Sequence, residues 1–152
     1  MSPDSALQRV RDLLEEVADA LDLEAEVVVE DRDGVIHGTL EGEELGLFIG
    51  RHGQTIDAVQ HLAFKAASKG DAPGPRVVID AAGYRDRRAQ VLHRQADQAA
   101  GDAIRHGRPV ALDAMSATER KVVHEHLKER GGVETFSEGQ EPDRHLVVSP
   151  LS

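Results

Sequence analysis

A glycine pair encloses two basic side chains in the segment Gly50-Arg51-His52-Gly53. Glycines let the backbone turn sharply and let a ligand approach it without interference from a Cβ atom. Apolar residues resume a helical spacing directly after Gly53, so we expect the free N–H groups and positive dipole end of a helix at this corner. Phosphate oxygens accept from such N–H groups, and Arg51 and His52 add further donors. The segment predicts an anion site, and an ordinary turn between two helices is the alternative.

A second candidate pair, Arg120 and His124, lies in a stretch of helical periodicity. The spacing puts both side chains on one face of a helix, beside the apolar residues Val123 and Leu127. The pair suits a semi-exposed grip on a phosphate. It also suits a solvated pair whose stems pack against a sheet, which is the commoner outcome for such a spacing.

The motifs of several other chemistries do not occur in the sequence. There is no cysteine, and the eight histidines lack the spacing of a metal site. Neither the phosphate-binding loop of nucleotide hydrolases nor the nucleophile elbow of acyl hydrolases is present. We therefore expect no enzyme activity, no metal, no cofactor and no small-molecule substrate.

Charge is unevenly distributed along the 152 residues, whose net charge is −10. Residues 1–50 hold 14 acidic and 3 basic side chains, whereas residues 51–110 hold 10 basic and 6 acidic ones. The basic segment gives an anion a place to dock, although the acidic flanks weaken the binding of a polyanion. Within it, Arg85, Arg87 and Arg88 predict a solvated helix start rather than a specific site, although the cluster could also track backbone phosphates.

The composition indicates a soluble globular protein, with 39% hydrophobic and 30% charged residues. No apolar run approaches the roughly 20 residues that span a bilayer. The N-terminus lacks the basic and apolar regions of a signal peptide. We therefore expect no membrane insertion and a cytoplasmic location.

The hydrophobic pattern predicts two small modules. The first is expected to contain helices at 5–21, at about 43–49 and from Gly53 to near Gly70, two strands joined at Asp33-Gly34, and a strand at 76–81. The second is expected to contain a helix at 84–106, a short strand at 109–113, a helix after Ser116, and paired strands in 133–139 and 144–149.

This order of elements, α-β-β-α-α-β and then α-β-α-β-β, predicts an α+β fold of two small α/β modules. The predicted domain limits are 1–82 and 83–152. At the start of the last helix, Ser116 and Glu119 have the spacing of a capping box, in which each side chain binds the N–H of the other residue.

The segment "IGRHGQTIDAVQHL" and the elements around it resemble the K-homology (KH) domain in its bacterial, type II arrangement. The GXXG loop of that domain clamps about four nucleotides of single-stranded backbone. The segments "GYRDRRAQVLHRQA", "GRPVALDAMSATERKVVHEHL" and "VETFSEGQEPDRHLVV" resemble the RxxxH domain that follows a KH domain in the bacterial Jag/KhpB family. Both signatures in this order are more specific than either alone.

The resemblance implies non-catalytic binding of single-stranded RNA and a part in post-transcriptional regulation. Carried over by position, the KH loop comprises Gly50, Arg51, His52 and Gly53. Arg120 and His124 form the RxxxH pair, and Arg144 on the final strand is a further candidate.

Few aromatic side chains are available to stack on bases, since phenylalanine and tyrosine make up 3% of the chain. A KH groove receives bases on aliphatic side chains instead. We expect Ile49 and Ile56 to contribute to that surface.

The resemblance also suggests a second small KH protein as a partner and a link to cell shape. Many relatives carry a small N-terminal Jag domain, which we expect to be missing because residue 5 already begins the first helix. The alternative function is an adaptor for protein partners built on a KH fold, as the net charge of −10 would allow. The intact glycines of the corner and the local basic segment favour RNA.

Overall fold

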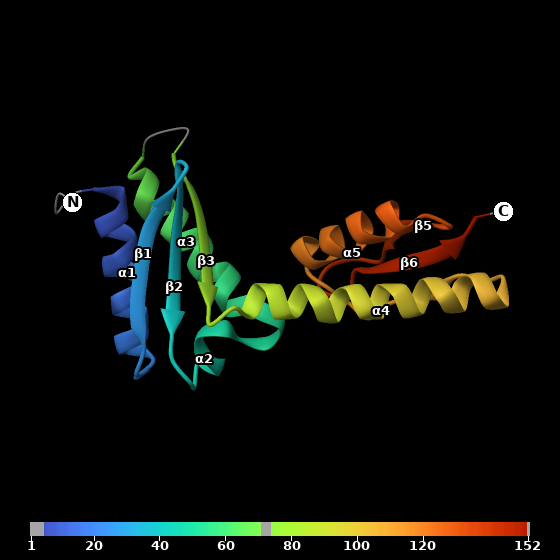
Figure 1. Cartoon of the computed structure of the whole chain (residues 1–152), viewed down its shortest axis with the longest axis horizontal. Helices are drawn as coiled ribbons and strands as arrows, with labels where there is room; N and C mark the ends of the chain where they lie inside the picture. The colour runs from blue at the N-terminus through green and yellow to red at the C-terminus, as the bar shows by residue number, and fades with distance from the viewer. Residues whose placement is uncertain (1–4, 71–73, 152) are drawn as a thin grey trace. The chain divides into compact units, whose positions relative to one another are not determined.

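The structure is a computed structural model of the 152-residue chain and describes residues 5–70 and 74–151 (Figure 1). Its contacts divide the chain into two compact units, residues 1–85 and 86–152. Each unit combines helices with a three-stranded sheet, so the predicted α+β class is confirmed. The division falls near the expected boundary, and 1–82 and 83–152 remain our proposed domain limits. Across residues 5–70 and 74–151, no helix is both long and apolar enough to cross a membrane.

The first unit follows the order α-β-β-α-α-β. Its helices are α1 (Ala6–Ala20), α2 (Gly46–Ile49) and α3 (Gln54–Ser68), with the 3-10 turn η1 (Arg51–Gly53) between the last two. Its strands are β1 (Glu26–Arg32), β2 (Val35–Glu41) and β3 (Arg76–Ala81), in the sheet order β1-β2-β3. β1 and β2 run antiparallel, whereas β2 and β3 run parallel.

One hydrophobic core holds this unit together. α1 and α3 pack on the sheet face that carries Ile36, Leu40 and Ile79, all of which are buried. Phe48 of α2 is fully buried in the same core. Each fully buried side chain of this kind contributes roughly 1.5–3 kcal/mol, so α2 and the start of α3 are held firmly against the sheet.

The turn between β1 and β2 has positive φ at both Asp33 and Gly34, 54° and 84°. Two positive φ angles are the type I′ geometry that Asp-Gly favours, and the predicted hairpin is confirmed. α2 is shorter than predicted and starts at Gly46. The two preceding glutamates stay exposed in the loop, while Leu45 and Phe48 supply the buried contacts.

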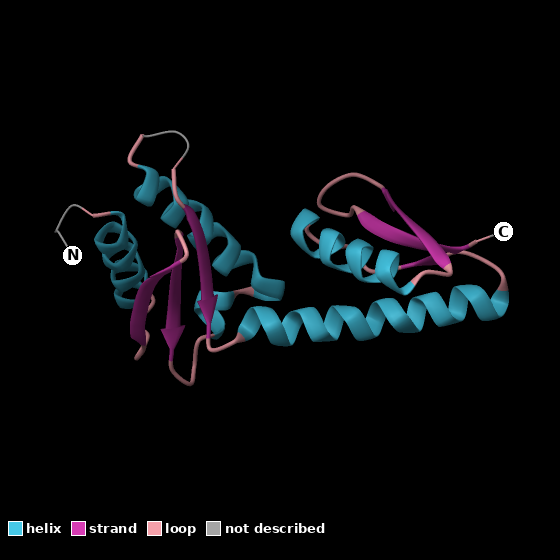
Figure 2. Cartoon of the chain, turned by 45° about the horizontal axis from the view of Figure 1, so that its top comes forward, coloured by secondary structure: helices cyan, strands magenta, loops and turns pink. Residues whose placement is uncertain are grey.

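The second unit is built on α4 (Tyr84–His106), whose first two residues belong to the first unit. It continues with β4 (Val110–Ala111), α5 (Ala117–Arg130), β5 (Val133–Glu138) and β6 (His145–Pro150). The sheet order is β4-β6-β5 and neighbouring strands run antiparallel, as predicted for the last two strands. α4 and α5 pack on one face of this sheet (Figure 2). α4 contributes mostly alanines to the core: Ala96, Ala99, Ala100 and Ala103.

The start of α5 departs in part from the predicted capping box. Ser116 Oγ accepts a hydrogen bond from the Glu119 N–H at 3.2 Å, as expected. The Glu119 carboxylate instead accepts from Arg88 Nε and Nη2, at 2.7 and 3.2 Å. A two-pronged arginine–carboxylate pair is a strong contact, and it ties α4 to α5. The prediction of a solvated arginine cluster is therefore wrong for Arg88.

Candidate nucleic-acid interface

The corner between α2 and α3 depends on both of its glycines. Gly50 has φ 73° and ψ 178°, a conformation that other residues adopt only under strain. A Cβ atom on Gly50 would lie 2.3 Å from Thr55 Oγ1 and 2.8 Å from the Thr55 nitrogen. Gly53 has φ 82°, and a Cβ atom there would lie 3.0 Å from Cε1 of Tyr84. The chain can make this close turn only where no side chain interferes.

Arg51 and His52 both extend into solvent from this turn. His52 adopts the left-handed conformation, with φ 54° and ψ 28°. Gly53 occupies the N-cap position of α3, and no side chain caps the first turn of that helix. The Gln54 N–H at the very start of α3 donates to the Arg51 carbonyl. The donors of this corner are therefore the exposed side chains of Arg51 and His52 and the N–H groups that follow in the first turn of α3.

One acidic side chain, Asp57, lies in the first turn of α3 and would repel an anion. Its carboxylate is paired with Arg85 Nη1 at 2.9 Å, which offsets that charge. Arg85 also donates from Nε to the Ile79 carbonyl at 2.6 Å and from Nη2 to Gln60 Oε1 at 3.1 Å. Arg85 is thus half-buried and links α3 to β3, so the prediction of a solvated side chain is wrong for it as well.

The two isoleucines predicted to contact bases differ in exposure. Ile49 is half-buried and packs beside the first core. Ile56 is 0% exposed, so it stabilises the core and offers no surface to a base. We therefore remove Ile56 from the candidate interface.

Leu47 of α2 is 66% exposed and adds an apolar surface next to the corner that was not predicted from the sequence. The exposure of Leu47 could have been inferred from its neighbour Phe48, which is buried. Successive residues of a helix do not share a face, so a buried Phe48 directs Leu47 outward.

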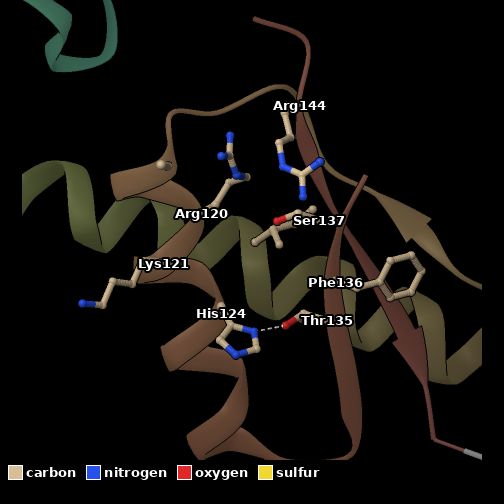
Figure 3. A pocket seen from close by; sticks show the side chains of 9 residues that line it. Arg120, Lys121, His124, Thr135, Phe136, Ser137 and Arg144 are labelled. Carbon is tan, nitrogen blue, oxygen red and sulfur yellow. Dashed lines mark hydrogen bonds between the residues drawn. The ribbon is translucent and has the colours of Figure 1, made fainter. Parts of the chain in front are cut away.

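The second unit has a hollow of about 450 Å³ between α5 and β5. It brings together the three residues predicted on this unit, Arg120, His124 and Arg144. Figure 3 shows Arg120, Arg144 and Ser137 gathered at one end, and His124 with Thr135 at the other. Two guanidinium groups at one hollow create a positive potential that attracts an anion.

Arg120 is held inside the protein. Its side chain is 10% exposed, and its Nη2 forms an ion pair with Glu141 Oε1 at 2.8 Å. Its Nη1 donates to the Met115 carbonyl. The sequence allows two environments for Arg120: a semi-exposed position that binds phosphate, or a solvated position on the surface. The observed guanidinium has neither environment, because the Glu141 carboxylate and the Met115 carbonyl bind it on both sides.

His124 and Arg144 are more accessible than Arg120. The His124 ring is exposed, and its Nδ1 forms a hydrogen bond with Thr135 Oγ1. Arg144 is half-buried and donates from Nη1 to the Gly139 carbonyl at 2.6 Å. Its planar guanidinium carries further N–H groups that an anion can use.

Six residues that were not predicted from the sequence also line this hollow: Ala117, Lys121, Thr135, Phe136, Ser137 and Leu146. Alternate residues of a strand share a face, so Thr135 and Ser137 lie on the side of the buried Val133. The hydroxyls of Thr135 and Ser137, on the face of β5 that also carries a buried residue, could have indicated a polar pocket from the sequence. The ring of Phe136, which is 47% exposed, turns away from His124 (Figure 3).

Neither site contains an arrangement for a metal. Over the described ranges 5–70 and 74–151, no three histidine or acidic side chains gather closely enough to hold an ion. The groups present are donors for an anion.

Comparison with known proteins gives a family match for each of the two modules. Residues 8–79 match the KhpA/KhpB KH domain, and residues 90–150 match the RxxxH domain. Over 140 residues the chain is 34% identical to the RNA-binding protein KhpB of Clostridium symbiosum, an alignment that covers 91% of this chain and 63% of that protein. The chain belongs to the Jag/KhpB family. Both matched Jag/KhpB domains are binding modules rather than catalytic ones.

Two further Jag/KhpB relatives are also named RNA-binding protein KhpB. The protein of Lactiplantibacillus plantarum is 44% identical over 104 residues, which cover 68% of this chain and 32% of that protein. The protein of Bacillus subtilis is 28% identical over 145 residues, which cover 94% of this chain and 70% of that protein. The chain therefore spans between about a third and about two thirds of these Jag/KhpB proteins.

Proposed function

We propose that the chain binds single-stranded RNA without catalysis and acts in post-transcriptional regulation in the cytoplasm. The observation that carries the proposal is the exposed Gly50–Gly53 corner. Its glycines adopt positive φ angles at the uncapped start of α3, and Arg51 and His52 extend into solvent beside it.

At this corner a phosphate of the RNA backbone would accept hydrogen bonds from N–H groups in the first turn of α3, beyond the Gln54 N–H that already donates to the Arg51 carbonyl. Arg51 adds a charge-assisted donor, and such a bond contributes about 1.5–3 kcal/mol. A loop of this kind clamps about four nucleotides. The bases then rest against the apolar surface of Leu47 and Ile49, since few aromatic side chains are exposed there.

The hollow of the second unit provides a further contact for longer strands. Arg144 and the exposed His124 would bind a backbone phosphate, with Thr135 and Ser137 supplying hydroxyl groups. Two weak sites on one chain act together through effective concentration, so a strand that reaches both binds more tightly than either site alone.

The relatives support this proposal, because all three carry RNA binding in their names. The KH match belongs to a KhpA/KhpB domain family, and a second small KH protein is a further proposed partner.

The test replaces Arg51 and His52 together by Asp and measures the affinity for a labelled single-stranded RNA of about fifteen nucleotides, longer than the roughly four that a KH loop grips. Losing a charge-assisted bond and adding repulsion should weaken binding at least about tenfold. Both side chains are exposed, so the melting temperature should not change.

Arg105 and His106 offer a matched control, because they form the same adjacent pair and are exposed at the end of α4. The Arg105→Asp, His106→Asp variant changes the charge by the same amount away from the corner. A much smaller loss of affinity is expected for it. Equal losses in the two variants would mean that the corner is not a specific site, and no RNA binding by the unaltered chain would favour an adaptor for protein partners.

A further inference from the structure

Glu141 forms an ion pair with Arg120, the arginine of the RxxxH motif. Its Oε1 lies 2.8 Å from Nη2 of Arg120, and the Arg120 side chain is 10% exposed while that of Glu141 is 59% exposed. A carboxylate and a phosphate present similar anionic oxygens to a guanidinium. The protein thus supplies from its own chain the kind of group that an RNA backbone would bring to this hollow.

We infer that Glu141 is an internal competitor for phosphate, so that RNA reaches Arg120 only by displacing the Glu141 carboxylate. The inference rests on the proposed function, because it concerns the RNA that the hollow is proposed to bind. It adds a residue that sets the affinity and the selectivity of that hollow.

Displacement requires little movement of the backbone. Glu141 lies in the connection between β5 and β6, which the Asp143 N–H to Gln140 carbonyl bond, at 2.8 Å, closes as a turn. Arg144 Nη1 donates to the Gly139 carbonyl at 2.6 Å and holds the same connection. The Glu141 side chain can therefore rotate into solvent while the connection keeps its shape.

The exposure of Glu141 makes the competition weak enough to overcome. An ion pair with one solvated partner contributes little free energy. Water screens the attraction, and the Glu141 side chain loses conformational freedom when it pairs. The other acceptor of Arg120, the Met115 carbonyl, remains in place and keeps the guanidinium oriented.

This arrangement should favour long strands over small anions. A free anion must replace Glu141 without help, whereas the phosphates further along a strand already held at the corner are tethered to the same chain, which raises their effective concentration. Glu141 then suppresses occupation of the hollow by isolated phosphate groups.

The experiment compares Glu141→Gln with Glu138→Gln in the complete chain. Glu138 is exposed at the end of β5, so its replacement removes the same charge from the same hairpin without freeing Arg120. Removing the competitor should raise the affinity for a strand of about fifteen nucleotides by about three- to fivefold, the size of a solvated ion pair. Glu138→Gln should change it less than about twofold, since salt screens exposed charges.

An Arg120→Lys background tests whether the gain passes through Arg120, because lysine lacks the planar fork. The gain from Glu141→Gln should disappear there. Equal affinities for Glu141→Gln and Glu138→Gln, or a loss in the former, would overturn the inference and make Glu141 a support for Arg120.

If Glu141→Gln alters the melting temperature, Glu141→Asp serves as a second test of the inference. It keeps the charge but shortens the stem, so a smaller gain is expected, and no gain overturns the inference. The Arg51→Asp, His52→Asp variant separates the two proposals. If it binds RNA as the unaltered chain does, the proposed corner fails whatever Glu141 does.

Discussion

At Gly50 the space for a Cβ atom is occupied by Thr55. The nearest atoms, Thr55 Oγ1 at 2.3 Å and the Thr55 nitrogen at 2.8 Å, belong to the first turn of α3. A side chain at this position would push the start of α3 away from the end of α2. The shape of the corner therefore requires a residue without a side chain at position 50, in addition to Gly53.

Gly50→Ala should weaken RNA binding and lower the stability together. The φ of 73° strains an alanine, and such strain costs about 1–3 kcal/mol before the contact with Thr55 is counted. RNA affinity and a chemical unfolding curve measure the two effects. Gly46→Ala is the control, because a Cβ on Gly46 meets nothing within 4 Å, and it should bind RNA normally.

Among single residues, those whose role follows from local backbone chemistry could be identified from the sequence. Gly50 and Gly53 adopt the positive φ angles that a sharp corner requires. Ile56 and Glu141 could not be assigned in this way. The burial of Ile56 depends on the sheet beneath α3, and the partner of Glu141 comes from a helix distant in sequence.

At the scale of elements, α4 and α5 are joined by the pair of Arg88 and Glu119. Their side chains are 19% and 10% exposed, and Nε and Oε1 lie 2.7 Å apart. Ser116 caps α5 one turn away. The side of α5 that carries Arg120 is positioned by these two contacts.

Glu119→Ala should lower the free energy of unfolding by about 3 kcal/mol, because it leaves the largely buried guanidinium of Arg88 without its carboxylate. Denaturant unfolding measures the change. Glu125→Ala is a matched control on the exposed side of α5 and should stay within about 0.5 kcal/mol of the unaltered chain. Similar losses in the two variants would show that the pair adds little.

The order of the elements and the pairing of strands within each hairpin could be predicted almost completely, whereas the side-chain contacts between helices could not. Periodicity, the Asp33-Gly34 turn and the Ser116 cap are local signals, and each was confirmed. The pairing of Arg88 with Glu119 arises only when α4 and α5 pack together. Local patterns carry no information about such a partner.

At the scale of the whole molecule, the proposal assigns one RNA contact to each unit. The corner lies in residues 1–85 and the hollow in residues 86–152. A short strand would use the corner alone, whereas a longer one could engage both. The length dependence of binding therefore reports on the second contact.

Replacing His124 and Arg144 together by Ala should weaken binding of a strand of about fifteen nucleotides more than that of one of about five, because the corner alone holds about four. His124 is exposed, but Arg144 is half-buried and donates to the Gly139 carbonyl, so a modest loss of stability is expected beside the loss of affinity. Affinities for the two lengths and a thermal melt test this. Equal losses on both lengths would restrict the second unit to a structural role.

Tyr84 gives the corner a reporter of its own. It is the only tyrosine of the chain, and its ring lies against Gly53. Protein made with fluorotyrosine would therefore carry a single fluorine signal, located directly beneath the donors of the corner. RNA contains no fluorine, so a shift of that signal on titration would report events at the corner without background from the ligand.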